Sequence, residues 1–299
     1  MSIMRRKAAI AQTGNARKIG LTVFAFIIVC FGTPAAFALD TMGLPAAGLR
    51  QDEYRLGIDY SYSKMDLDLS EGKYSDYVLH YDLVQRTGQL QPKVLKDLTI
   101  HKGYVNLGYG ITDMGEVFMR IGGALAEFEG SMWESGEIFN SNLDFSISGG
   151  AKVTFYEDDF LKIGGLCQLS YTKFDGIMKP DDWPTISYPG ADSVNIEITE
   201  MQIAVGPAYE IEDNVIIYGG PFYHYLTGDM ENIYTGLYTV ENNPAGLITM
   251  EYSWSLEEDA TYGGYIGTRM KLAENSSLNM EYQLTSAAYC IGTSITWRF

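Results

Sequence analysis

Three histidines are the side chains of this sequence best suited to acid–base or metal chemistry. His80, His101 and His224 are widely spaced, and no Cys or His cluster has the spacing of a zinc site. His224 lies between Tyr223 and Tyr225, with no Asp two residues before it, and no Ser-His pair is indicated by spacing. We therefore expect His224 to have a structural role or to lie at the edge of the fold without a catalytic function. No enzymatic activity, metal or cofactor is expected.

Charge and cysteine content narrow the possibilities further. The net charge of −17, from 21 basic and 38 acidic residues, argues against nucleic-acid binding, which depends on Lys and Arg neutralising phosphates. Cys30, Cys167 and Cys290 form no CxxC pair. Cys167 and Cys290 are predicted on opposite faces of their strands, so a disulfide between them is not expected.

Residues 1–38 have the order of a secretory signal peptide. Basic residues without any acidic residue flank the start of the apolar run 19–31, which Pro34 and the small-x-small sequence 36–38 follow. The run is shorter than the ~20 residues of a spanning helix, so a membrane anchor is the less favoured alternative. We expect cleavage before Leu39 and export.

After Leu39, apolar residues alternate with polar or small residues in segments that turns separate. This period of two predicts strands. A soluble sandwich alternates as well, but here one face is aromatic and aliphatic while the other carries Gly, Ser, Thr, amides and charges, which suits an apolar exterior around a wet lumen. In the first segment Tyr54, Leu56, Ile58, Tyr60 and Tyr62 share the apolar face, opposite Arg55, Gly57, Asp59, Ser61 and Ser63.

The pattern predicts an all-β fold, a transmembrane antiparallel up-and-down β-barrel of ten strands. Tight turns at 112–115, 157–159, 212–214 and 274–276 alternate with long segments at 67–97, 129–141, 175–193 and 229–258. The ten strands are expected near 53–66, 98–111, 116–127, 142–156, 160–173, 196–211, 215–227, 259–272, 277–286 and 288–299. Residues 233–256 leave twelve strands as the alternative, although we interpret their even-numbered apolar face as an extension of the strand at 259–272.

The end of the chain and one hairpin resemble those of Gram-negative bacterial outer-membrane β-barrel proteins. The last strand ends in Trp297-Arg298-Phe299, and residues 109–117 look like an inner-side hairpin turn of such barrels. The resemblance implies location in the cell outer membrane, contact with outer-membrane lipid and lipopolysaccharide, and recognition of Phe299 by the barrel-assembly machinery. It also implies a short periplasmic segment at 39–51 and a barrel at 52–299 with long extracellular loops.

Omptin surface proteases are ten-stranded barrels that use an Asp-His pair and an Asp pair at the outer rim. Here the Asp-x-Asp sequence near the rim is Asp66-Leu67-Asp68, and His224 lacks the neighbouring Asp. The resemblance to omptins therefore fails at the catalytic positions, and an omptin-like rim hydrolase is the least favoured function.

The polar strand faces place charged side chains inside the predicted barrel. Most of the basic ones fall toward the periplasmic end, which predicts a positive ring and anion selectivity if a pore exists. The alternative is a set of salt bridges that fill a narrow lumen. The candidates are Arg55, Asp59, Lys102, Glu116, Arg120, Asp144, Lys152, Lys162, Glu200, Arg269, Lys271, Glu281 and Arg298.

Two Gly-Pro pairs lie within predicted strands, and three tryptophans lie in segments expected to be external. Gly206-Pro207 and Gly220-Pro221 are equidistant from Asn214, and we expect a local bulge there in preference to a lateral gate. Trp133, Trp183 and Trp254 fall in regions expected to be external, where an interfacial aromatic belt is the favoured role.

The sequence leaves several functions open for such a barrel. A narrow or gated pore for ions or small solutes and a closed structural barrel are the leading ones, since ten strands lie near the size that side chains can fill. A surface-loop adhesion or binding protein is the alternative. The solute, the loop ligand and the oligomeric state are not assigned by the sequence.

Overall fold

The computed structural model describes residues 39–79, 83–129, 137–180, 191–212, 214–240, 243–258 and 262–299. The predicted signal peptide lies outside these ranges. Within them, no helix is long and apolar enough to cross a membrane.

The described residues form thirteen strands in one antiparallel sheet. The strands are β1 (Tyr54–Leu79), β2 (Leu83–Gln89), β3 (Lys93–Thr112), β4 (Gly115–Glu129), β5 (Glu137–Ser141), β6 (Asp144–Glu157), β7 (Leu161–Pro180), β8 (Ala191–Glu212), β9 (Val215–Val240), β10 (Asn243–Glu257), β11 (Tyr262–Ala273), β12 (Ser276–Thr285) and β13 (Ala288–Arg298).

Ten of these strands close a ring, which confirms the predicted barrel of ten strands. The order is β1, β3, β4, β6, β7, β8, β9, β11, β12 and β13, and β13 returns to β1 from Arg55↔Arg298 to Met65↔Ala288. The start of β1 and the last residue complete the closure, because the backbones of Tyr54 and Phe299 exchange hydrogen bonds of 3.1 and 2.9 Å. The role of Phe299 in assembly stays a prediction.

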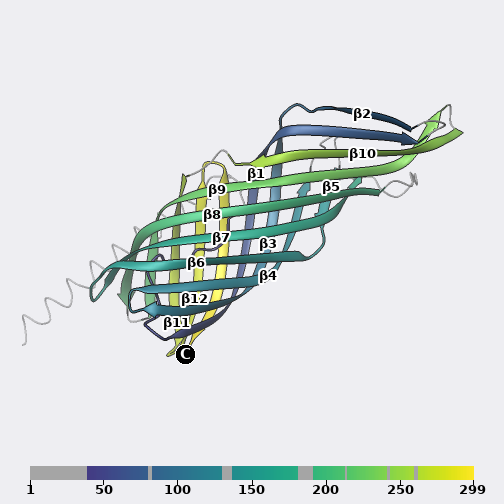
Figure 1. The fold of residues 1–299 in the computed structure, drawn as a ribbon. Coiled ribbons are helices and arrows are strands. Elements are labelled where there is room, and N and C mark those ends of the chain that lie inside the picture. Colours follow the sequence, from purple (N-terminus) through teal and green to yellow (C-terminus); the bar gives the residue numbers. More distant parts are fainter. Residues whose placement is uncertain are drawn as a thin grey trace, which may run out of the picture. The chain divides into compact units, whose positions relative to one another are not determined.

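Three strands lie outside the ten-stranded ring. β2 pairs with β1, and β5 continues the position of β6 between β4 and β7. β10 pairs with β9 on one side and with β1 on the other, beyond the point where β13 ends. At the end opposite the tight turns, β1, β2, β9 and β10 therefore extend together (Figure 1).

The expectation that residues 233–256 belong to one long strand with 259–272 is wrong. Residues up to Val240 extend β9, and β10 is a separate strand that turns back beside it. The β12–β13 hairpin turns at 286–287, which leaves the edge of β1 from Asp68 onward without β13 as a partner. β10 takes that edge, so the twelve-strand alternative is wrong as well.

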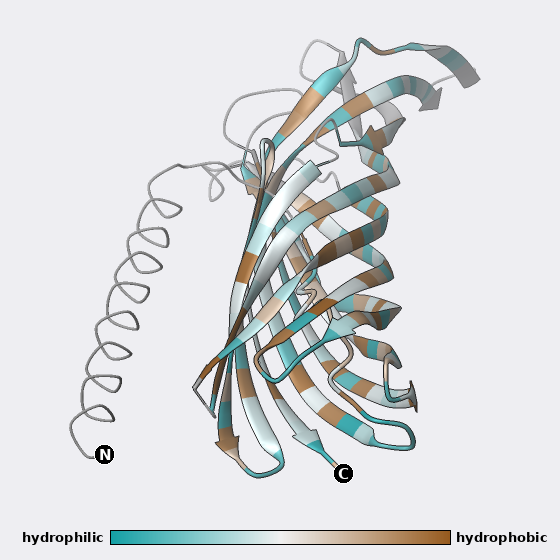
Figure 2. Ribbon diagram, turned by 90° about the vertical axis from the view of Figure 1, so that its left-hand side faces the viewer, coloured by the Kyte–Doolittle hydropathy of each residue, from teal (hydrophilic) through white to brown (hydrophobic). Residues whose placement is uncertain are grey.

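The strands alternate in polarity along their length (Figure 2). The burial of their side chains shows that the sense of this alternation inverts partway along the long strands. Near the tight turns, Ile58 is 60% exposed on the outside while Asp59 is 2% exposed inside. Farther along β1, Met65 and Leu67 are buried inside and Asp66 lies on the outer face. One half of the barrel therefore has an apolar exterior and a polar interior, and the other half has the reverse.

The inversion explains why the expected long loops are largely strands. In segments 67–97, 175–193 and 229–258, most described residues continue the sheet. Their inward positions are mostly apolar and many of their outward positions are polar or charged, as in a sheet that faces water. Strand pairing beyond an apolar exterior band satisfies the backbone groups that a loop would leave to solvent.

The N-terminal segment lies inside the barrel and not in the periplasm. Residues 39–51 were expected in a short periplasmic segment, but residues 39–49 lie inside the barrel. Leu39, Met42 and Leu49 are buried, and the chain emerges at the tight-turn end, where Asp52 donates its backbone N–H to Gly110 (2.9 Å). Burying these apolar side chains in the barrel lowers the free energy relative to leaving them in water.

Candidate functional site

Residues 39–49, named the plug from here on, are held in the lumen by two buried carboxylates. Glu281 accepts the backbone N–H groups of Met42 (2.8 Å) and Gly43 (2.7 Å). Glu116 accepts those of Gly48 (2.7 Å) and Leu49 (3.0 Å). Each carboxylate therefore holds two consecutive backbone amides, which are charge-assisted hydrogen bonds and stronger than neutral ones.

The carbonyl groups of the plug are held by lumenal donors. Arg120 donates to Thr41 O (2.6 Å) and Lys152 to Met42 O (2.9 Å). Asp40 O accepts from two amide side chains, Gln283 at 2.8 Å and Gln168 at 3.4 Å. An extended backbone without such partners would be costly in a closed interior, so these side chains provide the hydrogen bonds that water would otherwise supply.

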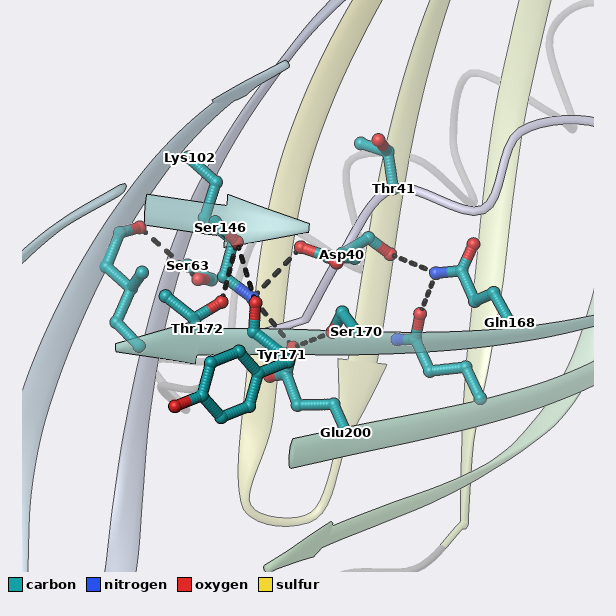
Figure 3. Close-up of polar contacts among 12 residues, drawn as sticks. Asp40, Thr41, Ser63, Lys102, Ser146, Gln168, Ser170, Tyr171, Thr172 and Glu200 are labelled. Carbon is teal, nitrogen blue, oxygen red and sulfur yellow. Dashed lines mark hydrogen bonds and ion pairs between the residues drawn. The ribbon is translucent and has the colours of Figure 1, made fainter. Parts of the chain in front are cut away.

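A buried ion triad holds the first part of the plug. Lys102 Nζ lies 3.0 Å from Asp40 Oδ1 and 2.6 Å from Glu200 Oε2, and all three side chains are at most 3% exposed. Ser170 donates to the same oxygen of Glu200 at 2.7 Å. Figure 3 shows Asp40 reaching from the plug into this cluster. Buried charges are tolerated when they are paired and hydrogen-bonded in this way.

Two glycines in the wall make room for the plug. A Cβ added to Gly292 would overlap the Thr41 side chain, and one added to Gly164 would overlap the backbone of Ala46. The close approach of plug and wall therefore depends on the absence of side chains at these positions. Sequence patterning could not identify them, because the lumenal faces contain many other small residues.

The charged positions predicted in the lumen are mostly buried there, but they do not form an open positive ring. Arg55 pairs with Glu116 at 3.0 Å, and Arg120 pairs with Asp59 at 2.9 Å. With Lys102 between Asp40 and Glu200, and Arg120 and Lys152 also bound to plug carbonyls, these cations have local partners. The arrangement corresponds to the alternative of salt bridges that fill a narrow lumen.

Four predicted positions differ from this pattern. Lys162 is 39% exposed at the mouth next to a tight turn, where it pairs with Glu157 at 2.7 Å and not with a residue deep in the lumen. Lys271 and Arg298 are exposed at the mouth near the tight turns, where they line a cavity. Asp144 accepts the backbone N–H of Asp175 at 2.7 Å.

The half of the lumen beyond the triad is filled mainly by apolar side chains. Phe128 and Phe139 stack at a ring-centroid distance of 4.8 Å, and Phe174 and Leu256 are fully buried. Trp254 belongs to this core at 2% exposure, so its expected place in an external belt is wrong. Trp133 and Trp183 lie outside the described residues.

The outer surface near the tight turns has the distribution of a membrane-facing wall. Aliphatic side chains such as Leu107, Leu169 and Ile203 are half exposed there, and exposed aromatic rings flank them at two levels. Tyr54, Phe155, Phe160, Tyr209 and Phe299 lie toward the tight turns, and Tyr60, Tyr171, Tyr225 and Tyr262 lie farther along. A closed antiparallel ring with an apolar band between two aromatic girdles is the structure of a transmembrane barrel.

The chain is an outer-membrane β-barrel protein. Because barrels of this kind have short periplasmic turns and longer extracellular connections, we expect the tight turns at the periplasmic end and the extension of β1, β2, β9 and β10 at the extracellular end, and the two ends are named accordingly.

Comparison with known proteins finds similar folds but no matching family. No family model matches the chain, and no curated protein matches it. The outer-membrane protease OmpT from Escherichia coli is 12% identical, covering 82% of this chain and 97% of its own, with a TM-score of 0.38. The translocator domain of the autotransporter NalP from Neisseria meningitidis is 8% identical (84% and 90% covered, TM-score 0.40). The toluene transporter TbuX from Ralstonia pickettii is 10% identical (89% and 95%, TM-score 0.36).

The histidines are not brought together. His224 is fully buried and pairs through Nδ1 with Glu258, which follows β10 directly. His101 lies on the outer face, where its Nδ1 is 2.8 Å from the hydroxyl of Tyr60. His80 lies outside the described residues. The pairing of His224 with Glu258 could not be read from the sequence, because it depends on β10 folding back over the barrel.

The barrel wall contains two cysteines and two Gly-Pro pairs. Cys167 is exposed on the outer face and Cys290 is buried in the lumen, as predicted. The β8–β9 ladder is interrupted between Ala204↔Phe222 and Ala208↔Tyr218, where the two prolines lack N–H donors. The register is the same on both sides, so the expected bulge is wrong.

Proposed function

We propose that this protein is a closed outer-membrane barrel whose plug blocks the lumen at rest, and that it has no enzymatic role. The observation that supports this most directly is the set of hydrogen bonds between the plug and the wall. Glu116 and Glu281 each bind two plug amides, and Arg120 and Lys152 bind plug carbonyls. A segment held at so many points is unsuited to an aqueous path beside it.

The apolar core on the extracellular side supports the same proposal. Met65, Phe174 and Leu256 fill the lumen above the triad and are fully buried. Ions crossing this region would lose their hydration without compensating ligands. The barrel therefore has two independent seals, a polar one below and an apolar one above.

Absence of catalysis is supported by the burial of the histidine–carboxylate pair. His224 and Glu258 are at most 2% exposed, so a substrate at the rim would not reach either group. A general base must come within hydrogen-bond reach of the proton that it removes.

Planar-bilayer recording tests the proposal of a closed barrel. Wild-type protein should give no steady conductance, whereas Gly292→Val should give frequent openings because the new side chain displaces Thr41 and the plug. Gly103→Val is the matched control, since a Cβ at Gly103 meets nothing within 4 Å. A stable wild-type conductance that Gly292→Val does not change would refute the closed barrel and favour the constitutive pore.

A surface-binding role is the second candidate, favoured by the extracellular extension. β1, β9 and β10 continue beyond the outer girdle, and their outward positions include Lys73, Glu231 and Glu251. Such a rigid polar sheet suits contact with lipopolysaccharide or another cell surface. Cells displaying wild-type protein should adhere to surfaces better than cells whose residues 231–254 are replaced by a short turn, and equal adhesion would exclude this role.

A further inference from the structure

A cavity of about 230 Å³ opens at the periplasmic mouth, directly below the plug. Gly48 and Leu49 of the plug form part of its wall. The remaining wall comes from the periplasmic ends of β1, β8, β9, β11, β12 and β13 and from the turns between them. The cavity is thus inside the ring of strands and separate from the lipid-facing surface.

The lining of this cavity is rich in hydrogen-bond donors and in positive charge. Four basic side chains face two acidic ones, Glu210 and Glu274. Hydroxyl and amide side chains such as Ser276 and Asn275 complete the wall. The basic side chains are Arg55, Arg269, Lys271 and Arg298.

These four cations are unequally partnered. Arg55 is paired with Glu116, and Arg269 donates from Nε to Asn279 Oδ1 at 2.9 Å. Lys271 and Arg298 form no side-chain ion pair or hydrogen bond with any residue that the structure describes. Their charges are therefore available to a ligand in the cavity.

The register adds a second reason for an anion at this place. Arg55 and Arg298 are direct partners across β1 and β13, so their side chains leave the sheet on the same face about 5 Å apart at Cβ. Like charges in this position destabilise a strand pair. Glu116 offsets the charge of Arg55 and also accepts the backbone N–H of Leu49, but no ion pair of the described residues offsets the charge of Arg298. An anion in the cavity, next to both guanidinium groups, would offset the remaining repulsion.

We propose that this cavity binds a small soluble oxyanion of the phosphate class from the periplasm. Guanidinium groups match phosphate oxygens in a planar, two-pronged geometry, and a lysine adds a point charge. The cavity is smaller than the roughly 300–1,000 Å³ of pockets for drug-sized ligands, which suits phosphate or a short phosphate ester. Its place inside the ring favours a soluble anion over a lipid headgroup.

Isothermal titration of the detergent-folded full-length mature chain with inorganic phosphate tests the site. Wild-type protein should bind, and Lys271→Gln with Arg298→Gln should weaken binding by about tenfold or more because both unpaired charges are lost. Lys162→Gln is the control, since Lys162 lies at the same end of the barrel but outside the cavity. Glu274→Gln should tighten binding several-fold, because it removes a competing carboxylate and does not depend on a disruptive change.

The outcomes separate the possible anion sources. Phosphate binding that follows these variants supports the proposal. No phosphate binding by wild-type protein overturns it, as does binding that Lys162→Gln weakens equally. Interaction with phosphatidylglycerol in mixed micelles, without binding of free phosphate, would also overturn it in favour of a lipid site. A heat-dependent gel shift shows that each variant is folded before titration.

Discussion

At the scale of single residues, Lys102 is the lumenal cation that links the plug to the wall through a buried ion triad. It bridges Asp40 of the plug and Glu200 of the wall, and it is 1% exposed. Lys102→Met should lower the free energy of unfolding by about 3–5 kcal/mol, because two buried carboxylates would lose their counter-charge. Urea unfolding in detergent measures this change.

The exposed pair of Lys162 and Glu157 provides the comparison for that experiment. Lys162→Met should cost less than about 1 kcal/mol, since solvent screens an exposed ion pair. Equal effects of the two substitutions would show that Lys102 is not buried between charges. Lys102→Met combined with Glu200→Gln and Asp40→Asn should recover much of the loss, because no unpaired charge remains.

The alternation of residue types predicted which charged side chains point into the lumen. It did not predict the ion-pair partners of these side chains. The inward positions of Arg55, Asp59 and Lys102 follow from the period of two, because each strand has one face toward the lumen. One of the two partners of Lys102, Asp40, lies in the plug, and no periodicity links residues 39–49 to the wall. A usable signal was the apolar content of this segment, which is unusual for a chain expected in water.

At the scale of elements, β10 connects the extracellular ends of β9 and β1. Its Trp254 is buried in the apolar core, and Trp254→Ala should cost about 3–5 kcal/mol through the cavity that it leaves. The loss should be confined to the extracellular half, because β10 takes no part in the ten-stranded ring. Limited proteolysis should cleave the extension faster while the heat-dependent gel shift persists.

Ser253→Ala is the matched control for this prediction, since Ser253 lies next to Trp254 on the outward face of β10. It should leave proteolysis unchanged. Loss of the gel shift in Trp254→Ala would instead mean that the two halves of the barrel unfold as one unit.

The sequence predicted which segments form the membrane strands of this protein. It did not predict how far these strands extend. The membrane segments have aromatic and aliphatic exteriors, which the pattern identifies directly. Beyond the outer girdle, Val194, Ile196 and Ile198 continue the alternation with the apolar residues inside. The same alternation therefore describes two environments, and only the pairing of the strands distinguishes an extension from a loop.

At the scale of the whole molecule, the two cysteines of residues 39–299 report on the inside and outside of the barrel. In folded protein lacking residues 1–38, Cys167 should react with a detergent-soluble maleimide, whereas Cys290 should react only after denaturation. Mass spectrometry of the labelled peptides measures both rates. Equal labelling of the two cysteines in folded protein would contradict the assigned lipid and lumen faces.

The position of the plug has a consequence for the order of events during folding. Residues 39–49 are synthesised before every strand, yet Met42 and Asp40 bind Glu281 and Gln283, which lie 239 and 243 residues later. Contacts at such separation require most of the chain to be in place. The plug therefore cannot reach its native contacts until the final hairpin has formed. The segment that leaves the ribosome ahead of the barrel is the last to settle, and until then the carboxylates that hold it remain hydrated.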